Sequence, residues 1–78
     1  MNTSVKHKPA KAKEVWFSDR KLFVRLNDGR EIGVPFEWFP KLRDASEKEL
    51  QNWRFIGDGI GIHWESLDED ISIEGLLN

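Results

Sequence analysis

The tripeptide Asn27-Asp28-Gly29 constrains the fold of this chain more than any other feature of its sequence. It separates two segments, residues 22–26 and residues 30–34, in which every second side chain is apolar and suited to one buried face. A period of two is typical of a half-buried strand, and Gly29 accepts the positive φ that tight turns need. We therefore predict a β-hairpin, which Pro35 ends because proline cannot donate a hydrogen bond to a sheet ladder.

A further strand is expected immediately before this hairpin. Val15 and Phe17 alternate with the other side chains of residues 14–18, and Asp19-Arg20 supplies a two-residue turn. The first half of the chain therefore predicts a three-stranded antiparallel meander.

The middle of the chain predicts one short helix. Ser46 followed by Glu49 is a capping box, and it opens a helix of about two turns that we expect to end near Trp53. The aromatic segment before it, residues 36–40, begins after one proline and ends in another. We expect that segment to be a buried, irregular connection that packs Phe36, Trp38 or Phe39 over the sheet.

Two further short strands complete the expected fold. The first covers residues 60–64, and the last begins at Ile71 after a tight helical turn over residues 67–70. The fold class is thus α+β, a three-stranded antiparallel meander followed by one short helix and two short strands, in the order β-β-β-α-β-β.

Length and composition indicate one small domain. With 78 residues there is room for a single core, and nine aromatic side chains supply much of its apolar surface. Residues 1–13 hold little apolar surface and are interpreted as a flexible basic arm, and residues 14–78 as a single compact domain. The absence of cysteine, and of any apolar run near the roughly 18 residues of a membrane span, favours a cytoplasmic location and no membrane partner.

Charge is distributed unevenly along the chain, although the net charge is only −2. The first thirteen residues carry the lysines Lys6, Lys8, Lys11 and Lys13 and no acidic residue. A segment near the other end carries Glu65, Asp68, Glu69 and Asp70 without a nearby lysine or arginine. The arm permits weak, unspecific nucleic-acid binding, and the acidic segment permits mimicry of phosphate charge, but both are also typical of solvated surface.

His63 is the one candidate general base beside these carboxylates. It lies in a short strand between Ile62 and Trp64, where a histidine is more often a hydrogen-bonded structural residue. The chain also has no cysteine, tyrosine or Ser-x-Gly elbow that would serve as a nucleophile. We therefore expect no enzymatic activity.

No cofactor or metal is expected either. The acidic residues Asp68, Asp70 and Glu74 are too closely spaced for a calcium loop. The glycines Gly57, Gly59 and Gly61 follow a helix and precede a strand, whereas a phosphate-binding loop follows a strand and precedes a helix. A tight connection between helix and strand explains them.

A protein-binding surface is the remaining candidate. Trp16 alternates with the core-facing Val15 and Phe17, and Phe23 and Arg25 share its face on the next strand. An exposed patch of this composition is typical of a partner-binding surface, since tryptophan is enriched at interface hot spots. The alternative is that the helix covers this face and all the aromatic rings belong to the core.

The sequence also resembles a known family. The segments GREIGVPFEWFPKL and NWRFIGDGIGIHWESLDEDISIEGLL are similar to the pattern of domain-of-unknown-function family 2442 of short bacterial proteins, over roughly Glu14 to Leu77. Asp58 and Lys41 depart from that pattern, which often has Gly and Arg there. The resemblance implies a compact α+β domain, often encoded beside a small toxin-like protein.

Together these observations favour a non-enzymatic, antitoxin-like protein that binds a small cognate protein or a second copy of itself. The expected contact residues are Trp16, Phe23, Arg25, Glu65, Asp68, Glu69 and Asp70. The alternatives are a small regulator that binds nucleic acid through its arm, and an inhibitor of a defence protein that uses the acidic segment.

Overall fold

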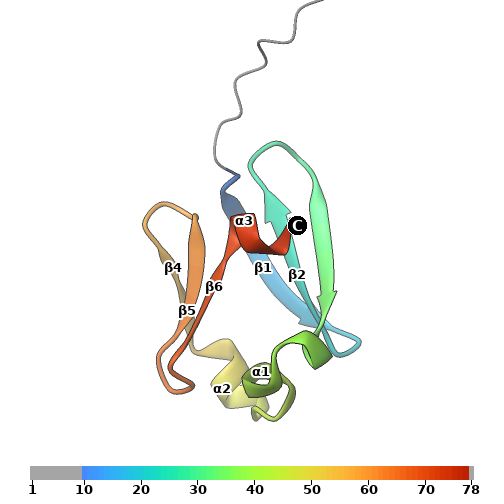
Figure 1. Ribbon diagram of the computed structural model, residues 1–78, viewed down its shortest axis with the longest axis vertical. Coiled ribbons are helices and arrows are strands. Elements are labelled where there is room, and N and C mark those ends of the chain that lie inside the picture. The colour runs from blue at the N-terminus through green and yellow to red at the C-terminus, as the bar shows by residue number, and fades with distance from the viewer. Residues whose placement is uncertain (1–9, 78) are drawn as a thin grey trace, which may run out of the picture.

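The computed structural model describes residues 10–77, which form two three-stranded antiparallel sheets with short helical segments (Figure 1). The first sheet contains β1 (Ala12–Ser18), β2 (Lys21–Leu26) and β3 (Glu31–Pro35), and the second contains β4 (Trp53–Ile56), β5 (Gly61–Trp64) and β6 (Glu69–Ser72). Between the sheets in the chain lie η1 (Phe36–Trp38), α1 (Pro40–Arg43) and α2 (Glu47–Gln51), and α3 (Ile73–Leu76) follows β6. The predicted α+β class is confirmed.

The predicted meander is the first sheet, in the order β1-β2-β3. Asp19 and Arg20 both adopt positive φ, 57° and 59°, in the two-residue turn between β1 and β2. Gly29 adopts a φ of 96° in the next turn, where the Leu26 N–H donates to the Arg30 carbonyl at 2.7 Å. Both turns therefore lie where the sequence pattern placed them.

The second half contains one strand, β4, and two short helices, α1 and α3, that the sequence did not predict. The capping box is present, but α2 ends at Gln51, and residues 53–56 form the additional strand β4. Trp53, Phe55 and Ile56 are half-buried and Arg54 is exposed, because these residues pair with β5 instead of continuing the helix. Pairing across the sheet overrides the weak local preference for helix.

Smaller differences occur near the end of the chain and in the aromatic connection. The expected helical turn at 67–70 is a turn over residues 65–68, after which β6 begins. The expected last strand ends at Ser72, whose hydroxyl accepts a hydrogen bond from the Gly75 N–H and so begins α3. In the connection Phe36 is buried, whereas Trp38 is 61% exposed.

The hydrophobic core lies between the two sheets. Its fully buried side chains are Leu22, Val24, Leu26, Leu42, Ile62, Trp64 and Ile73. The Trp64 ring reaches across the core to Phe17, with ring centroids 6.5 Å apart, and its Nε1–H donates to the Leu50 carbonyl at 3.0 Å. Trp64 thus connects the second sheet to the first and satisfies its own buried polar group. No helix among residues 10–77 has the length and apolar character that a membrane crossing requires.

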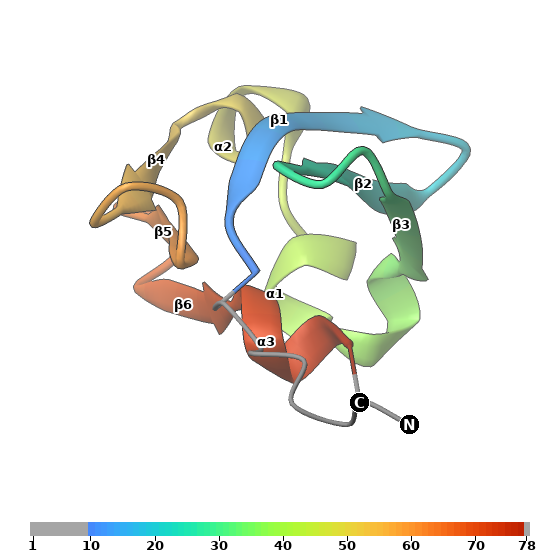
Figure 2. The same cartoon turned by 90° about the horizontal axis from the view of Figure 1, so that it is seen from above.

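Seen from above, the six strands surround this common interior (Figure 2). On one side the edges of β1 and β4 face each other, and on the opposite side α1 and α3 lie between the sheets. The β1 edge meets the turn between β4 and β5 at one point, where the Ala12 N–H donates to the Gly59 carbonyl at 2.7 Å. Farther along β1, the opening between the two edges leads to the candidate site.

Candidate protein-binding site

Trp16, Phe23 and Arg25 lie together on the outer face of the first sheet; we call them the aromatic–arginine cluster. Trp16 pairs with Phe23 in the β1–β2 register, and their rings stack with centroids 5.6 Å apart and planes 7° apart. Gly33 follows in the same row on β3. A Cβ atom at Gly33 would lie 2.7 Å from the Phe23 ring, so the glycine leaves the space into which this ring leans.

The next row across the sheet is ionic. Arg25 lies between Glu14 and Glu31, and its guanidinium is 2.6 Å from a carboxylate oxygen of each. The hydrogen bond to Glu31 and the charge of Glu14 raise the pKa of Arg25, so its charge is permanent. The guanidinium carbon lies 5.6 Å from the centre of the Trp16 ring, within the range of a cation–π contact. The two carboxylates fix the guanidinium over the indole.

The cluster is neither fully exposed nor part of the core. The opposite face of β2 carries the buried Leu22, Val24 and Leu26, which places Trp16 and Phe23 on the outside. Both rings are half-buried, because they cover each other and Gly33, and Arg25 is exposed. The structure therefore brings together the three residues that alternation predicted to share a face.

A pocket of about 470 Å³ opens beside this cluster. It is lined by Glu14, Val15, Trp16 and Arg25 from the first sheet and by Trp53 from the start of β4. Trp53 is held by an edge-on contact with Phe55, with ring centroids 5.0 Å apart. The sequence pattern predicts Trp53 at the end of a helix and not in this pocket, because no local signal shows which strand of a second sheet faces β1.

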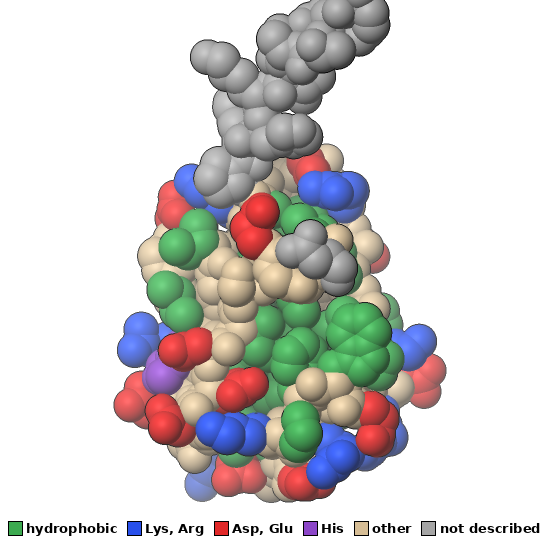
Figure 3. Space-filling model, viewed as in Figure 1, with side chains coloured by type: hydrophobic (Ala, Val, Ile, Leu, Met, Phe, Trp, Pro, Cys, Tyr) green, Lys and Arg blue, Asp and Glu red, His purple; other side chains and the backbone are tan. Residues whose placement is uncertain are grey.

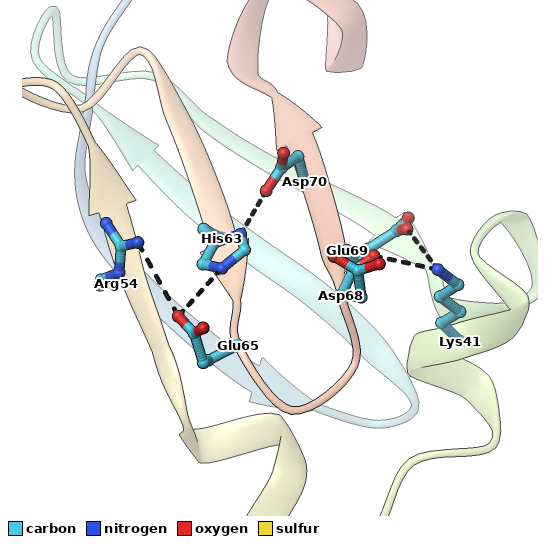
Figure 4. A network of polar contacts seen from close by, with 7 residues as sticks. All are labelled: Lys41, Arg54, His63, Glu65, Asp68, Glu69 and Asp70. Carbon is cyan, nitrogen blue, oxygen red and sulfur yellow. Dashed lines mark hydrogen bonds and ion pairs between the residues drawn. The ribbon is translucent and has the colours of Figure 1, made fainter.

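His63 lies in a polar network on the second sheet (Figure 4). Arg54, His63 and Asp70 form one row across β4, β5 and β6. The Nδ1 of His63 contacts an Asp70 carboxylate oxygen, and its Nε2 lies 3.2 Å from Glu65 Oε1. The hydrogen bond to Asp70 is the main cause that raises the pKa of His63. Both ring nitrogens of His63 thus have carboxylate partners.

The acidic segment is largely engaged within the molecule. Glu65 also lies 3.8 Å from the Arg54 guanidinium. Lys41 donates to the main-chain oxygen of Asp68 at 3.0 Å, and its Nζ lies 3.9 Å from Glu69. Together with the contact between Asp70 and His63, these contacts give three of the four carboxylates an intramolecular partner, and Glu69 is half-buried.

The basic arm is described only in part. Lys6 and Lys8 lie outside the described residues, whereas Lys11 is 2.6 Å from Asp58 and Lys13 belongs to β1. Within residues 10–77, no group of three His, Cys, Asp or Glu side chains is arranged to hold a metal ion.

The glycine-rich segment is a β-hairpin turn between β4 and β5 and not a connection between helix and strand. Gly57 and Gly59 have positive φ, and Gly59 lies against Ala12.

The opposite side of the molecule carries a second apolar area. Figure 3 shows hydrophobic side chains gathered in the middle of the face that carries α3, with charged side chains around them. The exposed large apolar residues of the described chain are Trp38, Ile60 and Leu77. Of the three aromatic residues of the connection that were candidates for packing over the sheet, Phe36 is buried and Trp38 is exposed.

Comparison with known proteins gives a family and a fold. A family model described as protein of unknown function (DUF2442) matches residues 12–78. A protein of unknown function from Rhodospirillum rubrum has a similar structure, with a TM-score of 0.77 and 29% identity over 90% of this chain and 87% of that one. The uncharacterized protein CV0863 from Chromobacterium violaceum has the same fold, with a TM-score of 0.72 and 23% identity over 86% of this chain and 63% of that one. The search of curated proteins found no match.

Proposed function

This chain belongs to the DUF2442 family of proteins of unknown function, and we propose that it acts as a protein-binding module without catalytic activity. The observation that carries this proposal is the aromatic–arginine cluster beside its pocket. Tryptophan and arginine are the residue types most enriched at interface hot spots. Here they are held in fixed orientations by stacking and ion pairs, so a partner would not have to order them on binding.

The other charged surfaces support this choice. Lys11 of the arm is paired with Asp58, and three carboxylates of the acidic segment have intramolecular partners. At Lys11 and at these three carboxylates, a phosphate backbone or a phosphate-binding protein would have to compete with an existing contact. The aromatic–arginine cluster instead offers apolar area that remains half-exposed.

More specifically, we propose an antitoxin-like role, in which the aromatic–arginine cluster covers a surface of a small cognate protein. The resemblance of the sequence to short bacterial proteins that are often encoded beside toxin-like proteins motivates this form. The partner to test first is therefore the product of the neighbouring reading frame, mixed with this protein in a pull-down and by titration calorimetry.

The variant Trp16→Ala tests the surface. Removing a hot-spot tryptophan typically costs about 2 kcal/mol, so the Kd for that partner should rise about thirtyfold. The stability should fall by about 1 kcal/mol, because the stack on Phe23 is also lost.

The matched control is Trp38→Ala, which removes an exposed tryptophan on η1 that does not line the pocket. We expect it to leave the Kd within about twofold, because interface residues outside hot spots contribute little. Weaker binding by Trp38→Ala, together with unchanged binding by Trp16→Ala, would place the binding surface at η1 instead of the aromatic–arginine cluster.

A further inference from the structure

The β1 strand presents an open edge directly beside the pocket. Hydrogen bonds between Leu26 and Arg30 and between Phe36 and Arg20 show that the even-numbered residues of β2 pair with β3. The odd-numbered residues of β2 therefore pair with the even-numbered residues of β1. It follows that the main-chain N–H and C=O groups of Val15 and Phe17 point away from β2, toward the gap between β1 and β4.

One end of this edge is closed. At Ala12 the gap is bridged by the hydrogen bond to Gly59. At Val15 it has widened into the pocket of about 470 Å³ that Trp53 lines from the other side. In the described part of the chain, no hydrogen bond crosses from β1 to the body of β4. An open edge beside an aromatic pocket is the arrangement in which an extended segment adds as a further strand.

The charge of the site selects the kind of segment. Glu14 and Glu31 share a single guanidinium, that of Arg25, so this row of side chains carries one carboxylate charge in excess. Glu14 itself lines the pocket and its side chain is 56% exposed. A basic side chain on the incoming segment complements this excess, and an apolar side chain two residues away fits between Trp16 and Trp53.

We propose that β1 receives an extended, basic and apolar segment of a partner protein, which pairs with the Val15 and Phe17 main chain and places an apolar side chain in the Trp16–Trp53 pocket. This mode of binding rests on the proposed function, because it specifies how a partner engages the same surface. It adds one requirement that the aromatic–arginine cluster alone does not impose: the partner must form hydrogen bonds with the main-chain groups of β1.

A selected peptide provides the probe. The full chain is immobilised and used to select from a phage-displayed library of random nine-residue segments, and the enriched sequences are synthesised and titrated. We expect the enriched sequences to show the period of two that is typical of a strand, and to combine basic with apolar residues. In the complex, amide exchange measured by NMR should slow at least about tenfold at Val15 and Phe17, because these N–H groups become hydrogen-bonded.

A pair of variants at one position separates the main chain from the side chain. Val15→Pro removes the outward N–H and is tolerated at an edge strand, whereas Val15→Ala keeps that N–H and shortens the same side chain. Val15→Pro should raise the peptide Kd at least about fivefold over Val15→Ala, the effect of one lost hydrogen bond. Glu14→Gln should weaken the binding of peptides with a basic residue and spare that of neutral ones.

The outcomes distinguish this proposal from the proposed function. Peptide binding that depends on Trp16 but is equal for the two Val15 variants, with no slowing of exchange at Val15, would overturn strand addition and leave the surface in place. Peptide binding that depends neither on Trp16 nor on the Val15 main chain would overturn both strand addition and the proposed binding surface. Three other results would also overturn strand addition at β1. They are failure of the selection to enrich any segment, slowed amide exchange at Gly33 on the β3 edge, and self-association that protects the Val15 amide without peptide. If Val15→Pro does not fold, the exchange measurement on the unsubstituted protein decides.

Discussion

His63 makes the stability of this protein depend on pH, because both of its ring nitrogens face carboxylates. Its pKa in the folded state is raised by the hydrogen bond and charge of Asp70 and by Glu65. The protonated ring is therefore stabilising below the unfolded pKa of about 6.5, and this contribution is lost as the pH rises through the higher folded value. We predict that the free energy of unfolding of the unsubstituted protein falls over this range relative to that of His63→Asn. Urea titrations at several pH values measure the free energy of unfolding of both proteins. If the two free energies change in parallel with pH, the prediction is wrong.

At the scale of single residues, the sequence predicted neighbours within one sheet and missed those between sheets. Trp16, Phe23 and Arg25 share a face because alternation and a two-residue turn determine the register of β1 on β2. Trp53 completes the pocket from a strand that is 37 positions along the chain from Trp16. Its position depends on how two sheets pack, which no pattern within either segment records.

At the scale of elements, the capping box of α2 contributes stability that a single substitution should reveal. The Ser46 hydroxyl accepts from the Glu49 N–H at 3.1 Å, and the Glu49 carboxylate accepts from the Ser46 N–H at 2.9 Å. Ser46→Ala removes the first of these bonds and should lower the free energy of unfolding by about 1 kcal/mol, or the Tm by roughly 4–8 °C. The control is Ser66→Ala in the exposed turn between β5 and β6, which should change stability by less than about 0.5 kcal/mol. Equal losses in the two variants would show that the box does not stabilise α2.

The same helix shows why beginnings of elements were easier to predict than ends. Ser46 and Glu49 are a specific start signal, and the structure places the helix start there. The end carries no glycine or proline, and Asn52 closes the helix with a non-helical backbone. The following residues, Trp53 to Ile56, are compatible with a helix or a strand, and they form a strand because they pair with β5.

At the scale of the whole molecule, the arrangement of the sheets depends on a few contacts between distant parts of the chain. The Ala12 N–H meets the Gly59 carbonyl, the Ala10 N–H meets Glu74 at 3.1 Å, and the Ile73 N–H meets the Ile60 carbonyl at 3.0 Å. These contacts hold β1, the turn between β4 and β5, and α3 around one interior. The sequence predicts one compact domain but not this arrangement, because each contact pairs residues whose local patterns are independent.

The contact between Ala12 and Gly59 can be tested with two glycines of similar conformation. Gly59 has a φ of 109°, and a Cβ atom there would lie 2.5 Å from the Ala12 carbonyl oxygen. Gly29 has a φ of 96°, but a Cβ atom there would have nothing within 4 Å. Gly29→Ala should therefore lower the free energy of unfolding by about 1–3 kcal/mol through backbone strain alone. Gly59→Ala should cost at least about 1 kcal/mol more, because β1 must also move away and the hydrogen bond to Ala12 is weakened.

Chemical denaturation of the two glycine variants measures this difference, and amide exchange locates it. In Gly59→Ala the Ala12 N–H should exchange faster than in Gly29→Ala, because its acceptor has been displaced. Since the same contact closes one end of the gap beside β1, its loss should also widen the approach to the pocket lined by Val15 and Trp53. Equal losses of stability in the two variants, with equal exchange at Ala12, would mean that the sheets are held together by the side-chain core around Trp64 and not by this main-chain contact.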